Sequence, residues 1–74
     1  MITEAQAVAI ARARAEEKGW GFAEPIAVVV REAWFSKRVL RYEIETNAGM
    51  LGTKARFVID AESGAIQSEG YIPR

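Results

Sequence analysis

Closely spaced carboxylates are the side chains of this chain best suited to chemistry, because two carboxyl groups with different surroundings can divide the roles of acid and base. The sequence holds three such pairs, which are Glu16 with Glu17, Glu43 with Glu45, and Asp60 with Glu62. Glu43 and Glu45 alternate along a strand pattern and share its outward side, whereas the other pairs lie at a helix end and in a turn. The pattern favours solvated carboxylates over a catalytic pair.

Nucleophiles and metal ligands are also scarce. The 74 residues include no histidine and no cysteine, so a histidine-activated serine, a thiolate and the commonest metal ligands are missing. Ser36 has Lys37 beside it, but adjacent side chains in a strand turn point apart. Residues 60–63 lack the number of oxygen ligands that calcium needs, and neither glycine pair (residues 19–21 and 49–52) has the strand, loop and helix order of a phosphate site. We expect no catalytic residue, metal or cofactor, and no enzyme.

Charge and hydropathy exclude further classes of partner. Ten basic and ten acidic side chains give a formal net charge of zero, and the two signs alternate along the strand patterns. A nucleic-acid surface needs a basic face to neutralise phosphates, so we expect no nucleic-acid partner. Glu4 stands where a signal peptide is basic, and no apolar run reaches the length of a membrane span. The chain is expected to be cytoplasmic and without a membrane partner, unless it is an excised mature or domain fragment.

One helix is predicted over residues 3–18. Thr3 and Gln6 fit a capping box, good helix formers fill the segment, and Gly19 stands where a left-handed C-cap is expected. The helical period gathers small and apolar residues on one face, namely Ala7, Val8, Ile10, Ala11 and Ala15, and sets Arg12, Ala13 and Glu16 opposite. A buried stripe made mostly of alanine lets the helix approach a sheet closely.

Strand patterns occupy the rest of the chain, at residues 26–35, 39–46, 54–60 and 65–72. Between helix and strands, Trp20 and Phe22 are expected to plug one end of the core. A hairpin joins the first two patterns around residues 36–37. A two-residue loop places Glu32 opposite Arg41. A three-residue loop instead moves the Trp34 side chain to the other face of the sheet, and the sequence does not decide between the two loops.

The last two patterns form a second hairpin. Its turn uses Asp60 to bind nearby backbone N–H groups and Gly64 to reach positive φ, and the pairing sets Arg56 across from Glu69. Because Gly70 interrupts the final pattern, the sheet has three to four strands. The sequence therefore predicts a single α+β domain over residues 1–74, with one N-terminal helix packed on an antiparallel sheet in the order α-β-β-β-β.

The segments ITEAQAVAIA at residues 2–11 and VIDAESGAI at residues 58–66 carry a family resemblance. They are similar to the helix start and hairpin of the PepSY superfamily, and of small immunity-protein families with the same helix-then-sheet, cystatin-like build. PepSY modules occur in protease propeptides and cell-envelope proteins, where regulation of peptidases has been proposed, and the immunity families neutralise a cognate toxin. The resemblance implies a non-catalytic domain that binds a protein.

The first strand pattern also indicates a contact surface. Residues 26–30 are apolar on both sides of the predicted strand, although one helix can cover only one face of a sheet. The surplus apolar side chains either meet a partner or are buried at one end of a curled sheet. The predicted contact residues are aromatic or flexible apolar anchors with two arginines for orientation, namely Trp34, Phe35, Met50, Leu51, Tyr71, Arg41 and Arg56. Three alternatives stay open, which are a regulatory or inhibitory module on a protein partner, an immunity protein, and a self-associating domain that forms a homodimer.

Overall fold

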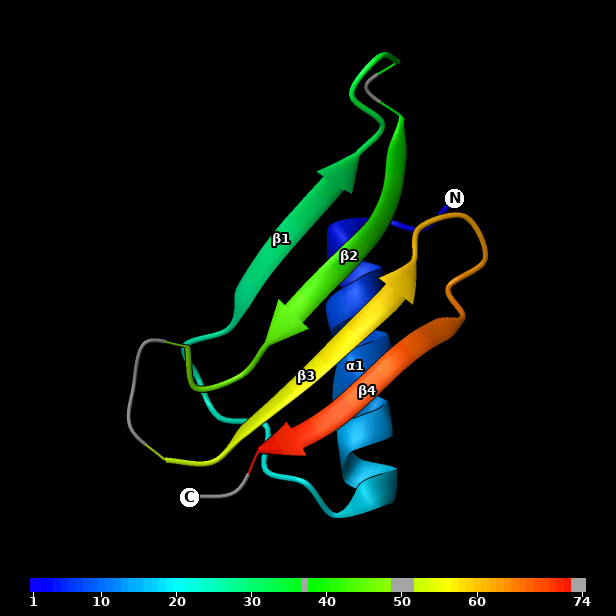
Figure 1. Cartoon of the computed structure of the whole chain (residues 1–74). Helices are drawn as coiled ribbons and strands as arrows, with labels where there is room; N and C mark the ends of the chain where they lie inside the picture. Colours follow the sequence, from blue (N-terminus) through cyan, green and yellow to red (C-terminus); the bar gives the residue numbers. More distant parts are fainter. Residues whose placement is uncertain (37, 49–51, 73–74) are drawn as a thin grey trace.

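A helix and an antiparallel sheet form the two layers of the structure (Figure 1). The computed structural model describes residues 1–36, 38–48 and 52–72. In that part of the chain the elements are α1 (Glu4–Lys18), β1 (Ala27–Glu32), β2 (Val39–Glu45), β3 (Lys54–Asp60) and β4 (Ile66–Ile72). The strands lie in sequence order, and each neighbouring pair is antiparallel. The predicted α+β class and α-β-β-β-β order are confirmed.

The ends of α1 are set by the predicted caps. The Thr3 hydroxyl accepts a hydrogen bond from the Gln6 backbone N–H at 3.1 Å, and the Thr3 N–H donates to the Gln6 side chain at 2.8 Å. Gly19 ends the helix at φ 73°, and the Trp20 N–H returns to the Ala15 carbonyl at 2.8 Å. Both ends therefore satisfy backbone groups that a bare helix leaves unpaired.

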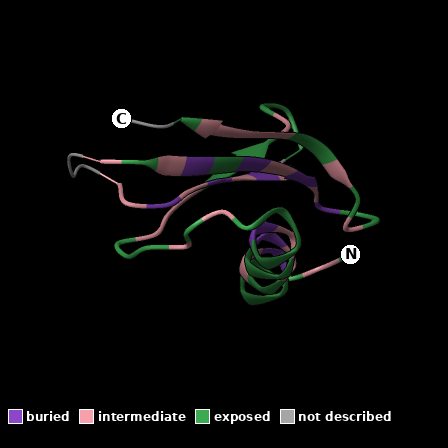
Figure 2. Cartoon of the chain, turned by 90° about the horizontal axis from the view of Figure 1, so that it is seen from below, coloured by how far each residue is buried: buried purple, intermediate pink, exposed green. Residues whose placement is uncertain are grey.

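The core lies between α1 and the two central strands. Ala7, Ala11 and Ala15 are fully buried, which confirms the predicted alanine face, and the sheet contributes Tyr42, Ile44, Ala55, Phe57 and Ile59. Figure 2 shows these buried segments facing one another across the two layers. Because alanine adds little bulk, the large side chains of β2 and β3 fill the space beneath the helix.

The first hairpin differs from both predicted loops. The pattern at residues 26–35 predicts a strand up to the turn, yet β1 ends at Glu32, and the Ala33 N–H donates to the Arg38 carbonyl at 2.8 Å. Glu32 pairs with Val39 and not with Arg41, because a bulge adds one residue to β2. The turn is therefore longer than either predicted loop, and Trp34 lies in it and not in the ladder.

The second hairpin has the predicted turn but a different register. Asp60 accepts hydrogen bonds from the N–H groups of Glu62 and Ser63, and Gly64 adopts φ 80°. The predicted pairing of Arg56 with Glu69 is wrong, because Glu69 lies opposite Phe57. A bulge at the start of this ladder shifts the count by one residue, which turns the Glu69 side chain toward the helix.

Candidate interaction surface

The tip of the β1–β2 hairpin carries two solvent-exposed aromatic rings. The Trp34 side chain is 92% exposed and that of Phe35 is 76% exposed. Their ring centroids are 5.6 Å apart at an interplanar angle of 83°, an edge-to-face arrangement that leaves most of both rings in solvent. We call these two residues the tip pair. Exposed aromatic area of this kind is typical of a contact surface and gives the domain no core stability.

Charged side chains cover the central part of the sheet face that points away from α1, here called the open face. Glu43 accepts from Arg31 Nε at 3.0 Å and from Arg41 Nε at 3.3 Å, and Arg56 Nε lies 4.0 Å from Glu45 Oε2. The hydrogen bond from Arg31 holds the pKa of Glu43 below its usual range, and the same contact raises the pKa of Arg31. Glu43 is therefore an ion-pair partner suited to staying ionised, unlike a general acid.

Arg41 and Arg56, which the sequence places in the contact set, both lie on this open face. Each is held by an intrachain carboxylate through its Nε group, Arg41 by Glu43 of the same strand and Arg56 by Glu45 across the β2–β3 ladder. A guanidinium has five N–H donors, so these contacts leave further donors on both arginines for an acceptor outside the chain. Their side chains are 43% and 62% exposed, which keeps those donors accessible.

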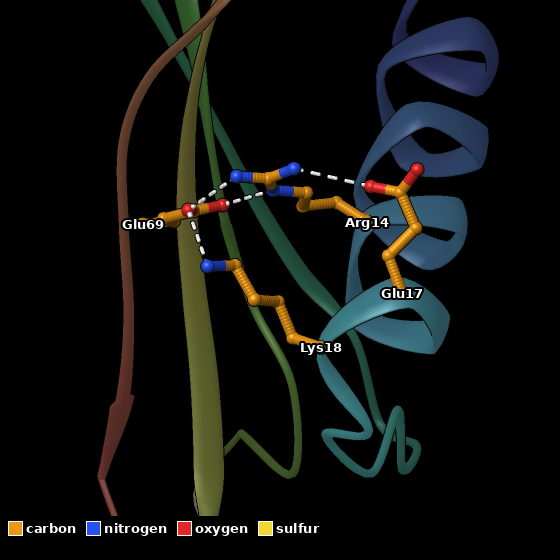
Figure 3. A network of polar contacts seen from close by, with 4 residues as sticks. All are labelled: Arg14, Glu17, Lys18 and Glu69. Carbon is orange, nitrogen blue, oxygen red and sulfur yellow. Dashed lines mark hydrogen bonds and ion pairs between the residues drawn. The ribbon is translucent and has the colours of Figure 1, made fainter.

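A second ionic network joins α1 to the edge strand β4 (Figure 3). Arg14 binds Glu69 in a bidentate manner, with Nε to Oε1 at 2.7 Å and Nη2 to Oε2 at 2.9 Å, and Lys18 lies 3.7 Å from the same carboxylate. Arg14 also donates to Glu17 at 3.1 Å. The Arg14 hydrogen bond lowers the pKa of Glu69, and its carboxylate contacts raise the pKa of Arg14. Sequence reasoning missed this network, although the spacing of Arg14 and Lys18 puts both on one helix edge.

Tyr71 lies on the opposite side of the sheet from Arg41 and Arg56. Its ring stacks on Trp20, with centroids 5.4 Å apart at 14°, and Trp20 in turn lies 5.9 Å from the Phe57 ring. Trp20 and Phe22 are partly buried against the core, as predicted for a plug at this end. Tyr71 thus belongs to the helix-side layer, and we leave it out of the surface proposed below.

The remaining predicted contacts, Met50 and Leu51, lie outside the described residues. Within residues 1–36, 38–48 and 52–72, no pocket is found and no group of acidic side chains is arranged to hold a metal ion. The same part of the chain has no helix long and apolar enough to cross a membrane. What the described residues offer is an exposed surface, with two exposed aromatic rings at one end and arginines across its open face.

The family assignment agrees with this architecture. A family model described as the peptidase propeptide and YPEB domain, PepSY, matches residues 1–69, which is nearly the full sequence. Comparison with curated proteins and with solved structures gives no match. The matched segment contains α1, β1, β2, β3 and the first part of β4, together with the turns of both hairpins. The chain therefore belongs to the PepSY family.

Proposed function

We propose that this PepSY domain is a non-catalytic, protein-binding module that regulates a peptidase, with Trp34 and Phe35 as its anchors. The family is described by its place in peptidase propeptides, which favours a regulatory module. The exposure of the tip pair, 92% and 76%, is the observation that carries the proposal. A chain this small has little apolar area to spare for its core, so two large rings left in solvent are best explained by a partner that covers them.

The tip pair can supply much of the binding free energy. Complete burial of one large apolar side chain contributes about 1.5–3 kcal/mol, and tryptophan is among the residues that dominate protein interfaces. The two rings already contact one another edge to face, which favours a restricted set of side-chain conformations before binding. Less side-chain freedom is then lost on binding, which favours affinity.

Arg41 and Arg56 are the orienting residues in this proposal. Their free N–H donors suit carboxylates or backbone carbonyls on the peptidase surface. Because both arginines already neutralise intrachain glutamates, their contribution is expected to lie in orientation and association rate more than in affinity. The net charge of zero agrees with a contact that does not depend on long-range attraction.

The test compares the wild-type domain with a Trp34→Ser, Phe35→Ser double variant. Immobilised domain is used to capture proteins from a lysate of the source cells, and a peptidase identified by mass spectrometry is then purified for affinity and activity measurements. We expect the double variant to bind that peptidase at least about tenfold more weakly and to lose its effect on peptidase activity. Its own fold should be unchanged, because the tip pair is mostly exposed and is not part of the buried core.

The matched control is Ala9→Ser with Ala13→Ser, two substitutions on the exposed side of α1. This variant should bind like the wild type. The proposal is wrong if the double variant retains full affinity, or if no captured protein is a peptidase. Neutralisation of a toxin stays a prediction from the sequence, because no contact in the described residues separates a toxin from a peptidase. A cytoplasmic location also stays a prediction from the sequence.

A further inference from the structure

β1 is the more apolar of the two edge strands in the described part of the chain. In the sheet order β1-β2-β3-β4, it pairs with β2 on one side only, and α1 packs on β2 and β3 (Figure 1). Its sequence is AVVVRE, and Val29 and Val30 are 43% and 39% exposed on opposite faces. An edge with apolar side chains on both faces and free backbone groups is a template for another strand.

The ladder shows which backbone groups of β1 point outward. The Thr46 N–H donates to the β3 residue Ala55 at 2.9 Å, and the Leu40 carbonyl accepts from Ala61, beyond the end of β3, at 3.1 Å. Because bonding direction alternates along an antiparallel strand, the residues of β2 that bond β1 are the odd-numbered ones, Arg41, Glu43 and Glu45. They are opposite Arg31, Val29 and Ala27.

The other residues of β1 therefore direct their backbone N–H and C=O groups away from the sheet. These residues are Val28, Val30 and Glu32. They lie every second residue along the strand, which is the arrangement that an incoming antiparallel strand needs. The charges of Arg31 and Glu32 and the neighbouring bulge lie at one end of this edge, and Pro25 lies just before the other end, so the three valines in the middle carry no such protection.

The opposite edge, β4, is a poorer template. Its sequence is IQSEGYI, with a glycine and three polar residues in the middle of the strand. Glu69 is committed to Arg14 and Lys18 of α1 on the helix side. Pairing at this edge would bring a new strand against an ionic network, whereas pairing at β1 would cover valines.

A second copy of β1 fits this edge. When two β1 strands run antiparallel with Val29 at the two-fold axis, Val28 of one copy lies opposite Val30 of the other. The backbone N–H and C=O groups that point away from each sheet then face one another and can form hydrogen bonds. In this register Arg31 faces Ala27 and Glu32 faces Ile26, and no like charges are opposed. Moving the axis to Arg31 would oppose two arginines, which disfavours that register. The net charge of zero removes general repulsion between copies.

We propose that β1 is a self-pairing edge, through which two copies of this domain join into one continuous antiparallel sheet of eight strands, four from each. The two-fold axis is perpendicular to the sheet, so both helices lie on the same side and both open faces on the other. The proposal goes beyond partner binding at the tip pair, because it uses the backbone edge and the valines and not Trp34 or Phe35. The short strand indicates a weak dimer that forms with rising concentration.

The first experiment measures mass against concentration by analytical ultracentrifugation, from about 10 µM to about 1 mM. The mass should rise from 8.2 kDa toward twice that value. Val29→Lys sets two lysines against each other at the axis and should weaken the dimer roughly fivefold or more. Val58→Lys is the matched control, on the same open face but in β3, and should leave the dimer unchanged.

Amide hydrogen exchange of the wild-type protein tests the edge without any substitution. Val28, Val30 and Glu32 should gain protection as concentration rises, whereas Val29 and Arg31, already bonded to β2, should change little. A constant monomer mass would overturn the proposal. The proposal would also be overturned if Val58→Lys weakened the dimer more than Val29→Lys does, since the contact would then lie on the open face of the sheet and not along the β1 edge.

The same measurements keep this proposal separate from the proposed function. The Trp34→Ser, Phe35→Ser variant should dimerise like the wild type even where it no longer binds a peptidase. Loss of dimer in that variant would instead place the contact between copies at the tip pair and would overturn self-pairing at β1.

Discussion

Replacing Ala11 with leucine tests how closely α1 packs on the sheet. Ala11 is fully buried in the middle of a stripe whose other members, Ala7 and Ala15, are also fully buried. Leucine adds three carbon atoms where Phe57 and Ile44 already fill the space under the helix. Extra methylenes in a well-packed core cost about 1–3 kcal/mol of unfolding free energy. A domain of this size has roughly 4–11 kcal/mol in total, so the substitution should remove a large share.

Thermal unfolding followed by circular dichroism measures this loss. A change of 1 kcal/mol shifts the Tm of a domain this small by about 4–8 °C, so Ala11→Leu should lower the Tm by at least about 4 °C. Ala13→Leu is the control, because Ala13 lies on the exposed side of the same helix and surface changes stay within about 0.5 kcal/mol. Equal Tm values for the two variants would refute close packing at Ala11.

Three further changes test the contacts around this core. Glu69→Gln should reduce the loss of stability on acidification below about pH 5. A carboxylate whose pKa is lowered in the folded state stabilises the fold above its unfolded pKa, and this effect is lost as the pH falls. Acid titrations of both proteins compare how steeply their stability falls with pH. Tyr42→Phe removes a 3.0 Å hydrogen bond to the Ile2 carbonyl and should cost about 0.5–1.5 kcal/mol in urea unfolding. Gly64→Ala, at φ 80°, should cost about 1–2 kcal/mol in the same assay, whereas Gly21→Ala, with open space around it, should cost less.

The helix and the order of the elements could be predicted because their signals are local. A capping box, a C-terminal glycine and an alanine face all lie within the seventeen residues of α1 and its two caps, so no tertiary information is needed. The turn at Asp60 is equally local, since its side chain bonds the next residues along the chain. The same reasoning explains why the family resemblance rested on these two segments.

Register could not be predicted, because one added residue changes every pair beyond it. The bulge in β2 moved Glu32 opposite Val39, and the bulge between β3 and β4 moved Glu69 opposite Phe57. The second shift explains the missed network with Arg14, since it carries the carboxylate to the helix side. Sequence alone placed Trp34 near the hairpin but could not show its exposure, which depends on where the strand ends.

The arrangement of the layers also explains why both proposed contact surfaces lie on the β1–β2 hairpin. The helix takes up the inner faces of β2 and β3, and ion pairs around Glu43 occupy the central part of the open face. The exposed large apolar side chains of this hairpin are those of Val29 and Val30 in β1, Leu40 in β2 and the tip pair, and Met1 and Ile72 are exposed elsewhere in the described residues. Since the core does not depend on them, Trp34 and Val29 can be substituted at little cost in stability. Changes at Phe57 instead remove core packing, so a binding defect at the hairpin can be separated from unfolding.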